Sequence, residues 1–275
     1  MTLQQLIKLN GKRAMKNKWS PAASIVLILC GAALFFSLLE MFLLAMPGVN
    51  FFIDDASGTE VFLKGLLNLP PIVYAIIMLC EFLAFTVHSP LSLGRKKWFY
   101  TLGAGEETDV SVIFEYFSSF RLLLKSVLLN FVTTMSKAFW GILFLSPASA
   151  FLGFTFYYIE KGAQGTELFI ARMGIAVGIL LLIFSMIMTY IYNLRYFAVP
   201  YAFIDEDVRI SEALKISKEV VSGHRGELFK LNISLLGYSA LSLFILTRLY
   251  SEPYLETVRG LYGRYLLQCR AAAQK

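Results

Sequence analysis

Four ionisable side chains lie inside long apolar stretches of the sequence, where a charge is costly and is therefore a candidate for function. These side chains are Glu40, Glu81, Lys137 and Arg172. At a rise of about 1.5 Å per helical residue, Glu81 and Lys137 each lie about 16–18 Å from an end of their stretch, near the middle of a membrane. We hypothesise that Glu81 and Lys137 pair or line a substrate or proton pathway, and that Glu40 and Arg172 pair near the outer surface. The alternative is that Lys137 and Glu40 extend to the headgroup regions.

A basic cluster follows the second apolar stretch and consists of Arg95, Lys96, Lys97 and Trp98. Each lysine or arginine near an anionic leaflet contributes about 1 kcal/mol of attraction, and tryptophan is enriched at membrane interfaces. We expect this cluster to contact anionic lipid headgroups at the membrane surface and to anchor the topology. A cytosolic partner is the alternative.

The other residue patterns do not support a catalytic, metal or cofactor site. The two histidines, His88 and His224, are far apart in the sequence, and no two cysteines have the C-x-x-C spacing of a metal or redox site. Gly103 and Gly105 lack the Gly-Lys-Ser/Thr that completes a phosphate-binding loop. We therefore expect no catalytic residues, no metal, no cofactor and no enzymatic activity. A lipid-modifying enzyme is the least favoured hypothesis, because no nucleophile–base pair is evident.

The elements that position these side chains must be membrane helices, because the composition excludes a water-soluble chain. Of the 275 residues, 57% are hydrophobic and 16% are charged, whereas a soluble domain carries about 25% charged residues. So few charges cannot cover the surface of a soluble fold of this size. A soluble enzyme, a disordered chain and a nucleic-acid-binding domain are thereby excluded, and three cysteines are too few for a disulfide scaffold.

Stretches of about 20 mainly apolar residues predict membrane-spanning helices. The sequence predicts five spans, at about residues 21–46, 70–88, 123–157, 168–199 and 228–249. It also predicts a basic helix over 1–20, a cytoplasmic amphipathic helix over 205–224 and an interfacial helix over 250–275. The expected fold is one all-α membrane domain, a polytopic transmembrane helix bundle of five spans with amphipathic interfacial helices.

The distribution of basic residues predicts the orientation, because lysine and arginine favour cytoplasmic loops. Five basic residues and no acidic residue precede Pro21, so we expect a cytoplasmic N-terminus. Five spans would then place Arg259, Arg264 and Arg270 outside, against the same rule. A sixth span over 250–268 would remove the conflict, but that segment is too charged to cross alone. The choice between five and six spans stays open.

Several short motifs lie between residues 196 and 266. They are Tyr196, Pro200-Tyr201, Glu212-Ala213-Leu214, Ser217, Gly223, Leu228-Phe229, Leu231, Ser234, Gly237-Tyr238, Pro253-Tyr254, Thr257, Tyr262 and Leu266. This pattern resembles a bacterial family of uncharacterised integral membrane proteins, domain of unknown function 975, akin to the YciC-like membrane proteins. Upstream, Trp140 and Pro147 are similar to the family's Trp and Pro-Gly pattern, with Ala148 in place of the glycine. The resemblance implies a five- or six-helix bundle in a bacterial cytoplasmic membrane, and it implies no catalytic residues because the family has no established chemistry.

Together these features favour a non-enzymatic integral membrane protein of a bacterial plasma membrane. We expect an accessory, assembly or envelope-homeostasis role, with the lipid bilayer, anionic headgroups and a membrane-protein partner or a second copy as the partners. The alternative is a small transporter or permease subunit that uses the charged residues at mid-membrane. A polar cavity that reaches Glu81 and Lys137 would favour transport, whereas an exposed apolar face would favour an accessory role.

Overall fold

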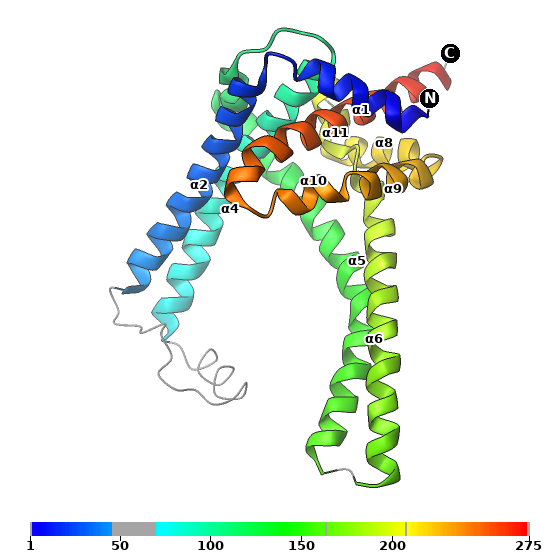
Figure 1. The fold of residues 1–275 in the computed structure, drawn as a ribbon. Coiled ribbons are helices and arrows are strands. Elements are labelled where there is room, and N and C mark those ends of the chain that lie inside the picture. Colours follow the sequence, from blue (N-terminus) through cyan, green and yellow to red (C-terminus); the bar gives the residue numbers. More distant parts are fainter. Residues whose placement is uncertain (1, 46–69, 163, 207, 274–275) are drawn as a thin grey trace.

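The computed structural model describes residues 2–45, 70–162, 164–206 and 208–273, and within these ranges it contains helices and no β-strand (Figure 1). The expected all-α class is therefore confirmed. The elements are α1 (Leu3–Ala14), α2 (Trp19–Ala45), α4 (Pro71–Gly103), η1 (Val110–Phe117), α5 (Phe120–Glu160), α6 (Thr166–Asn193), η2 (Leu194–Tyr196), α7 (Val199–Glu206), α8 (Ile210–Ser222), α9 (Arg225–Ser234), α10 (Leu236–Leu241) and α11 (Ile245–Ala273).

Two pairs of long helices extend from a body of shorter helices and diverge from each other as they leave it (Figure 1). The first pair, the α2–α4 arm, consists of α2 packed against α4, and the second, the α5–α6 arm, consists of α5 packed against α6. The body contains α1, η1 and the elements from η2 to α11, together with the near ends of the arms. Both ends of the chain lie at the body, on the side away from the arm tips (Figure 1).

The arms contain four segments that are long and apolar enough to cross a membrane, counted over the described residues: Trp19–Ala45, Pro71–Gly103, Phe120–Glu160 and Thr166–Asp205. Each segment overlaps one of the first four expected spans. Large apolar side chains on all four are exposed, among them Phe35, Met78, Ile142 and Leu180. Because soluble monomers rarely expose apolar surface on this scale, the arms have the character of a membrane protein.

The expected fifth span, 228–249, is not one helix and is not confirmed as a span. The chain there forms α9, α10 and the beginning of α11. Only residues 231–247 are free of charge, which is shorter than the roughly 20 residues that a span needs. In addition, Leu228, Leu231 and Leu235 are fully buried in the main core cluster, which holds α9 against the body. Tertiary packing therefore determines the structure of residues 228–249, although their composition alone predicts a membrane span.

The C-terminal segment is a central helix of the body, where we had expected an interfacial helix over 250–275. α11 carries a buried face that includes Tyr254, Val258, Tyr262 and Leu266. It packs against α1, α2, α4, α7, α8 and α10. Gly263 allows α11 to pack closely against Tyr201 of α7, because a Cβ at this position would lie 2.5 Å from the ring of Tyr201. α11 thus carries charged residues that are unfavourable in a bilayer, and it also has an apolar face that packs in the body.

α4 also extends beyond the expected boundary at residue 88 and continues to Gly103. Trp98 and Phe99 are fully buried in a second core cluster that includes Ile25 of α2 and Ile113 of η1. Gly94 lets η1 pack closely, since a Cβ there would lie 2.3 Å from the carbonyl oxygen of Ile113. The basic cluster that was expected at the membrane surface, after the second span, therefore lies inside a helix that is enclosed by the body.

Candidate functional site

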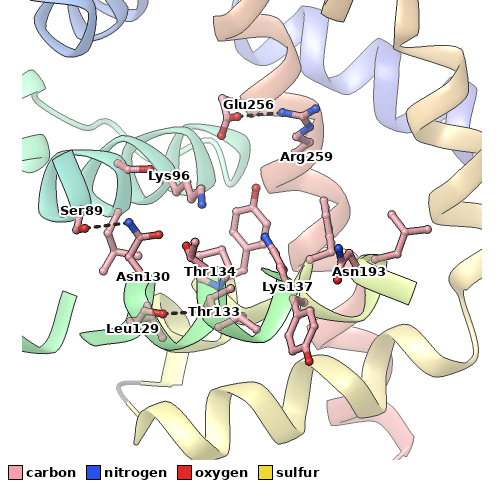
Figure 2. Close-up of a pocket in the computed structure, with 18 of the residues that line it drawn as sticks. Ser89, Lys96, Leu129, Asn130, Thr133, Thr134, Lys137, Asn193, Glu256 and Arg259 are labelled. Carbon is pink, nitrogen blue, oxygen red and sulfur yellow. Dashed lines mark hydrogen bonds and ion pairs between the residues drawn. The ribbon is translucent and has the colours of Figure 1, made fainter. Parts of the chain in front are cut away.

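A cavity of about 380 Å³ lies where both arms meet the body (Figure 2). Its walls come from α4, α5, α6, η2, α7, α9 and α11. Most of the side chains that line it are polar, which is unusual for the interior of a helical membrane fold. The polar lining residues are Ser89, Ser92, Lys96, Ser126, Asn130, Thr133, Thr134, Lys137, Tyr190, Asn193, Tyr196, Tyr201, Asn232, Glu256 and Arg259.

α5 supplies a polar stripe to this cavity. Ser126, Asn130, Thr133 and Lys137 follow one another at intervals of three and four residues, which places them on one helix face. The Asn130 amide donates a hydrogen bond of 2.9 Å to the hydroxyl of Ser89 and thereby joins α5 to α4. The hydroxyls of Ser126 and Thr133 donate to carbonyls of their own helix, each at 2.7 Å. The stripe is visible in the sequence as a period of polar residues, but of its members only Lys137 was among the predicted site residues, because the others carry no charge.

α4 divides the basic cluster among different environments. Consecutive helical residues point in directions about 100° apart, so the cluster cannot form one surface. Lys96 lines the cavity, Arg95 forms ion pairs with Glu252 and Glu256 of α11, and Lys97 binds Glu115 of η1 at 2.6 Å. Trp98, expected at a membrane interface, is fully buried. The expectation of a single lipid-facing cluster at Arg95–Trp98 is therefore corrected.

α11 contributes an ion pair to the upper wall of the cavity as drawn in Figure 2. Arg259 donates to the Glu256 carboxylate at 3.2 Å, and Arg95 lies 4.0 Å from the same oxygen. Burial by itself raises the pKa of Glu256, but the guanidinium groups of Arg95 and Arg259, together with the ammonium group of Lys96, outweigh burial and hold this pKa below its ordinary value. Glu256 is consequently an ionised counter-ion for the two arginines.

The cavity lining carries an excess of positive charge. Lys96, Lys137 and Arg259 contribute three cationic groups, and Glu256 contributes one anionic group. Glu256 is already paired with Arg259, whereas the ammonium groups of Lys96 and Lys137 form no hydrogen bond or ion pair with any described residue. Figure 2 shows the two lysines approaching the same space from α4 and α5. Two ammonium groups beside several hydroxyl and amide groups form a suitable environment for an anion.

An aromatic cluster beside the cavity fixes the near end of the α5–α6 arm. The Arg195 guanidinium lies 4.1 Å from the ring centre of Tyr192 and 5.1 Å from that of Trp140. The Trp140 indole donates a hydrogen bond of 3.2 Å to the hydroxyl of Tyr196, which lines the cavity. Cation–π contacts of this kind hold the cavity wall in a defined position. Trp140 is one of the residues on which the family resemblance rested, whereas Arg195 was not singled out from the sequence.

The proposed Glu81–Lys137 pair is not present. Glu81 lines a separate groove of about 320 Å³ between α2 and α4, together with Glu40 and His88, whereas Lys137 lines the cavity. Lys137 is 23 residues from the end of α5 at the arm tip, or about 35 Å at about 1.5 Å per residue, which exceeds a hydrocarbon thickness of about 30 Å. This length is compatible with the alternative hypothesis that Lys137 lies at the boundary of the apolar region, which stays a prediction. The first turns of α5 lie in the body. A depth that is counted from the start of the apolar stretch therefore places Lys137 too far along the arm.

The proposed Glu40–Arg172 pair is also not present. Glu40 lies on α2 in the groove of the α2–α4 arm, and Arg172 is an exposed residue of α6 in the other arm. Neither residue has a hydrogen bond or ion pair with another residue in the part of the chain that is described. The arms diverge between these positions, which the sequence alone does not indicate (Figure 1).

The comparison with known families extends the resemblance seen in residues 196–266. The sequence matches the family model described as protein of unknown function (DUF975) over residues 1–270. No curated protein and no solved structure matches the chain. Because the family match covers almost the whole sequence, the chain belongs to the DUF975 family.

Proposed function

We propose that this chain is a four-span protein of a bacterial plasma membrane, with the body and both termini in the cytoplasm. Five basic residues and no acidic residue lie before Pro21, at the body end of α2. Basic residues favour the cytoplasmic side, and an even number of spans returns the C-terminus to that side. Arg259, Arg264 and Arg270 then satisfy the same rule, which five spans would violate.

The biochemical role that we propose is non-enzymatic binding of an anionic, phosphate-type group in the cavity, as part of an accessory or envelope-homeostasis function. The supporting observation is the lining, in which the ammonium groups of Lys96 and Lys137 form no ion pair with a described residue, and in which Glu256, the acidic group that attracts Lys96, is already paired with Arg259. A partly buried charge without a counter-ion is unfavourable, so an anion that binds there gains affinity. The hydroxyl and amide donors of α4 and α5 can satisfy the remaining phosphate oxygens.

The test measures binding with and without the two lysines. In purified protein in dodecyl maltoside, inorganic phosphate or phosphatidylglycerol should raise the unfolding temperature relative to chloride at equal ionic strength. Lys96→Gln combined with Lys137→Gln should abolish this increase. Lys97→Gln removes the same charge from the next residue of α4, outside the cavity, and should retain it. If neither anion stabilises the unmodified protein, the proposed role is refuted.

A small transporter or permease subunit is the second candidate function. The polar cavity reaches Lys137 at the edge of the apolar region, as a substrate site would. Glu81 and Glu40, however, lie in the separate α2–α4 groove, so no polar route that includes them is part of the cavity. Uptake of radiolabelled phosphate into liposomes that contain the purified protein, absent with the Lys96→Gln and Lys137→Gln variant, would favour transport over binding.

A further inference from the structure

The segment that follows the cavity wall is strongly exposed and apolar, and the proposed function does not account for it. Within residues 233–250, here called the apolar segment, Leu243 is 82% and Leu246 is 84% exposed. The other large apolar side chains that are exposed there are Ile233, Leu236, Leu241, Phe244 and Tyr250. Figure 1 shows α10 and the beginning of α11 on the side of the body from which the arms extend.

The position of the apolar segment favours lipid chains as its occupant. α11, which begins in this segment, packs against α2 of the α2–α4 arm, and residues 231–247 carry no charge. Tyr250 stacks on Trp19 with ring centres 4.4 Å apart, and Trp19 begins the first membrane helix. Because tryptophan and tyrosine mark the interface, residues 243–246 lie at the margin of the hydrocarbon or within it. Lys8 donates to the Ser234 carbonyl at 3.0 Å, which adds a positive charge at the headgroup level of the same segment.

The apolar segment also begins at the cavity. Asn232 lines the cavity, and the next residue, Ile233, is the first exposed apolar side chain of the segment. A ligand with a charged phosphate and hydrocarbon chains could therefore place its phosphate between Lys96 and Lys137 and its chains along the segment. A free phosphate ion would use the first contact and not the second.

We infer that the ligand of the cavity is an anionic phospholipid-type amphiphile, whose phosphate lies in the cavity and whose chains lie against residues 233–250. This inference rests on the proposed anion-binding function. It adds that affinity comes from both ends of the ligand, so a lipid binds more tightly than its headgroup alone. Burial of only two methylene groups already corresponds to about tenfold in affinity, so the difference is measurable.

The first experiment compares three probes on the purified protein in dodecyl maltoside: phosphatidylglycerol, diacylglycerol with the same chains, and inorganic phosphate. Phosphatidylglycerol should reach half-maximal stabilisation at a concentration at least about tenfold lower than inorganic phosphate, and diacylglycerol should stabilise little. Equal potency of inorganic phosphate would overturn the inference and leave the proposed function intact. Stabilisation by diacylglycerol equal to that by phosphatidylglycerol, with none by inorganic phosphate, would overturn both.

Variants of the apolar segment separate the two ends of the ligand. Leu243→Ser combined with Leu246→Ser should raise the half-maximal concentration of phosphatidylglycerol about tenfold and leave that of inorganic phosphate unchanged. Leu34→Ser combined with Leu38→Ser changes two residues of α2 that are both 58% exposed, and it serves as the matched control. If the control pair weakens phosphatidylglycerol binding as much as the segment pair does, the assignment of the chains to this segment is wrong.

A spectroscopic experiment tests the occupant of the segment without depending on ligand affinity. A nitroxide at position 246, in a background without the native cysteines, is measured in phosphatidylglycerol liposomes. Contact with lipid chains predicts high accessibility to oxygen and low accessibility to a nickel chelate. High accessibility to the chelate would indicate water at the segment, and low accessibility to both would indicate a protein partner or a second copy; either result overturns the inference.

Discussion

Replacing Glu256 by glutamine should destabilise the protein strongly, because this buried carboxylate holds two guanidinium groups together. Its carboxylate lies 3.2 Å from Arg259 and 4.0 Å from Arg95, with 7% of the side chain exposed. At an effective dielectric constant of about 20, these distances correspond to gross attractions of about 5 and about 4 kcal/mol. Desolvation offsets much of this. Arg95 keeps its ion pair with Glu252 in the variant, but Arg259, with 35% of its side chain exposed, loses its counter-ion Glu256. Breaking a fully buried pair costs about 3–5 kcal/mol, and solvent screens the partly exposed Arg259, so we expect a loss of about 2–3 kcal/mol in the free energy of unfolding.

The destabilisation by Glu256→Gln should depend on pH, because the pKa of Glu256 is lowered in the folded protein. Burial raises this pKa, but the neighbouring cationic groups outweigh burial. A carboxyl whose pKa is lower in the folded state stabilises the fold at pH values above its unfolded pKa, about 4.3 for glutamate. This contribution is lost as the pH falls through the folded pKa. The difference in stability between the unmodified protein and Glu256→Gln should therefore be constant above about pH 5 and should shrink below about pH 4.3.

The assay is unfolding in mixed micelles of dodecyl maltoside and sodium dodecyl sulfate, followed by tryptophan fluorescence at several pH values. Adding Arg259→Gln to Glu256→Gln removes the guanidinium that lost its counter-ion and should restore part of the lost stability. A Glu256→Gln variant as stable as the unmodified protein at pH 7, or a difference that does not change with pH, would refute the assignment of Glu256 as an ionised counter-ion.

Three further predictions concern packing and topology. Asn130→Leu removes the hydrogen bond between α5 and α4 and should lower the free energy of unfolding by about 1 kcal/mol, measured in the same mixed micelles. Gly94→Ala would place a Cβ 2.3 Å from the backbone carbonyl oxygen of Ile113, so we expect the free energy of unfolding to fall by about 1–3 kcal/mol. An unchanged free energy of unfolding would contradict the close contact of α4 and η1. In a background without native cysteines, Gln164→Cys at the tip of the α5–α6 arm should react with a membrane-impermeant maleimide in intact cells, whereas Ala272→Cys should react only after lysis. Labelling of Ala272→Cys in intact cells would exclude the four-span topology.

The sequence was sufficient to predict the arms, because a long and predominantly apolar helix has few alternatives in or near a bilayer. The four candidate spans among the described residues overlap four of the five that were expected. The sequence was not sufficient for residues 228–249, which have the composition of a span and form α9, α10 and the beginning of α11. The difference arises from Leu228, Leu231 and Leu235, whose burial in the body competes with burial in lipid. Both environments are apolar, so hydropathy alone does not distinguish them.

The candidate site was predictable only in part. Lys96 and Lys137 were both named from the sequence, one as a surface residue and one as a mid-membrane residue, and the fold brings both to one cavity. Their meeting depends on the number of α5 residues that lie in the body and on the continuation of α4 past residue 88. Both lengths are set by packing against α11 and η1 rather than by local propensity. A pairing that is predicted from equal depth in two separate stretches, such as that of Glu81 with Lys137, does not take these lengths into account.

The charges of α11 explain why the polar cavity is located at the junction of the arms. Glu252, Glu256 and Arg259 make this helix unsuitable as a span, yet its buried face holds it against α4. The charged residues near that face are thereby brought to the ends of the arms, where Arg95 on α4 pairs with Glu252 and Glu256. The polar stripe of α5, from Ser126 to Lys137, lines the same cavity as Glu256 and Arg259. This stripe precedes the part of α5 that is long enough to cross the hydrocarbon. Polar groups from both arms and from the body are therefore enclosed together, and in the four-span topology that we propose they lie outside the apolar layer, where an anion can reach them without crossing it.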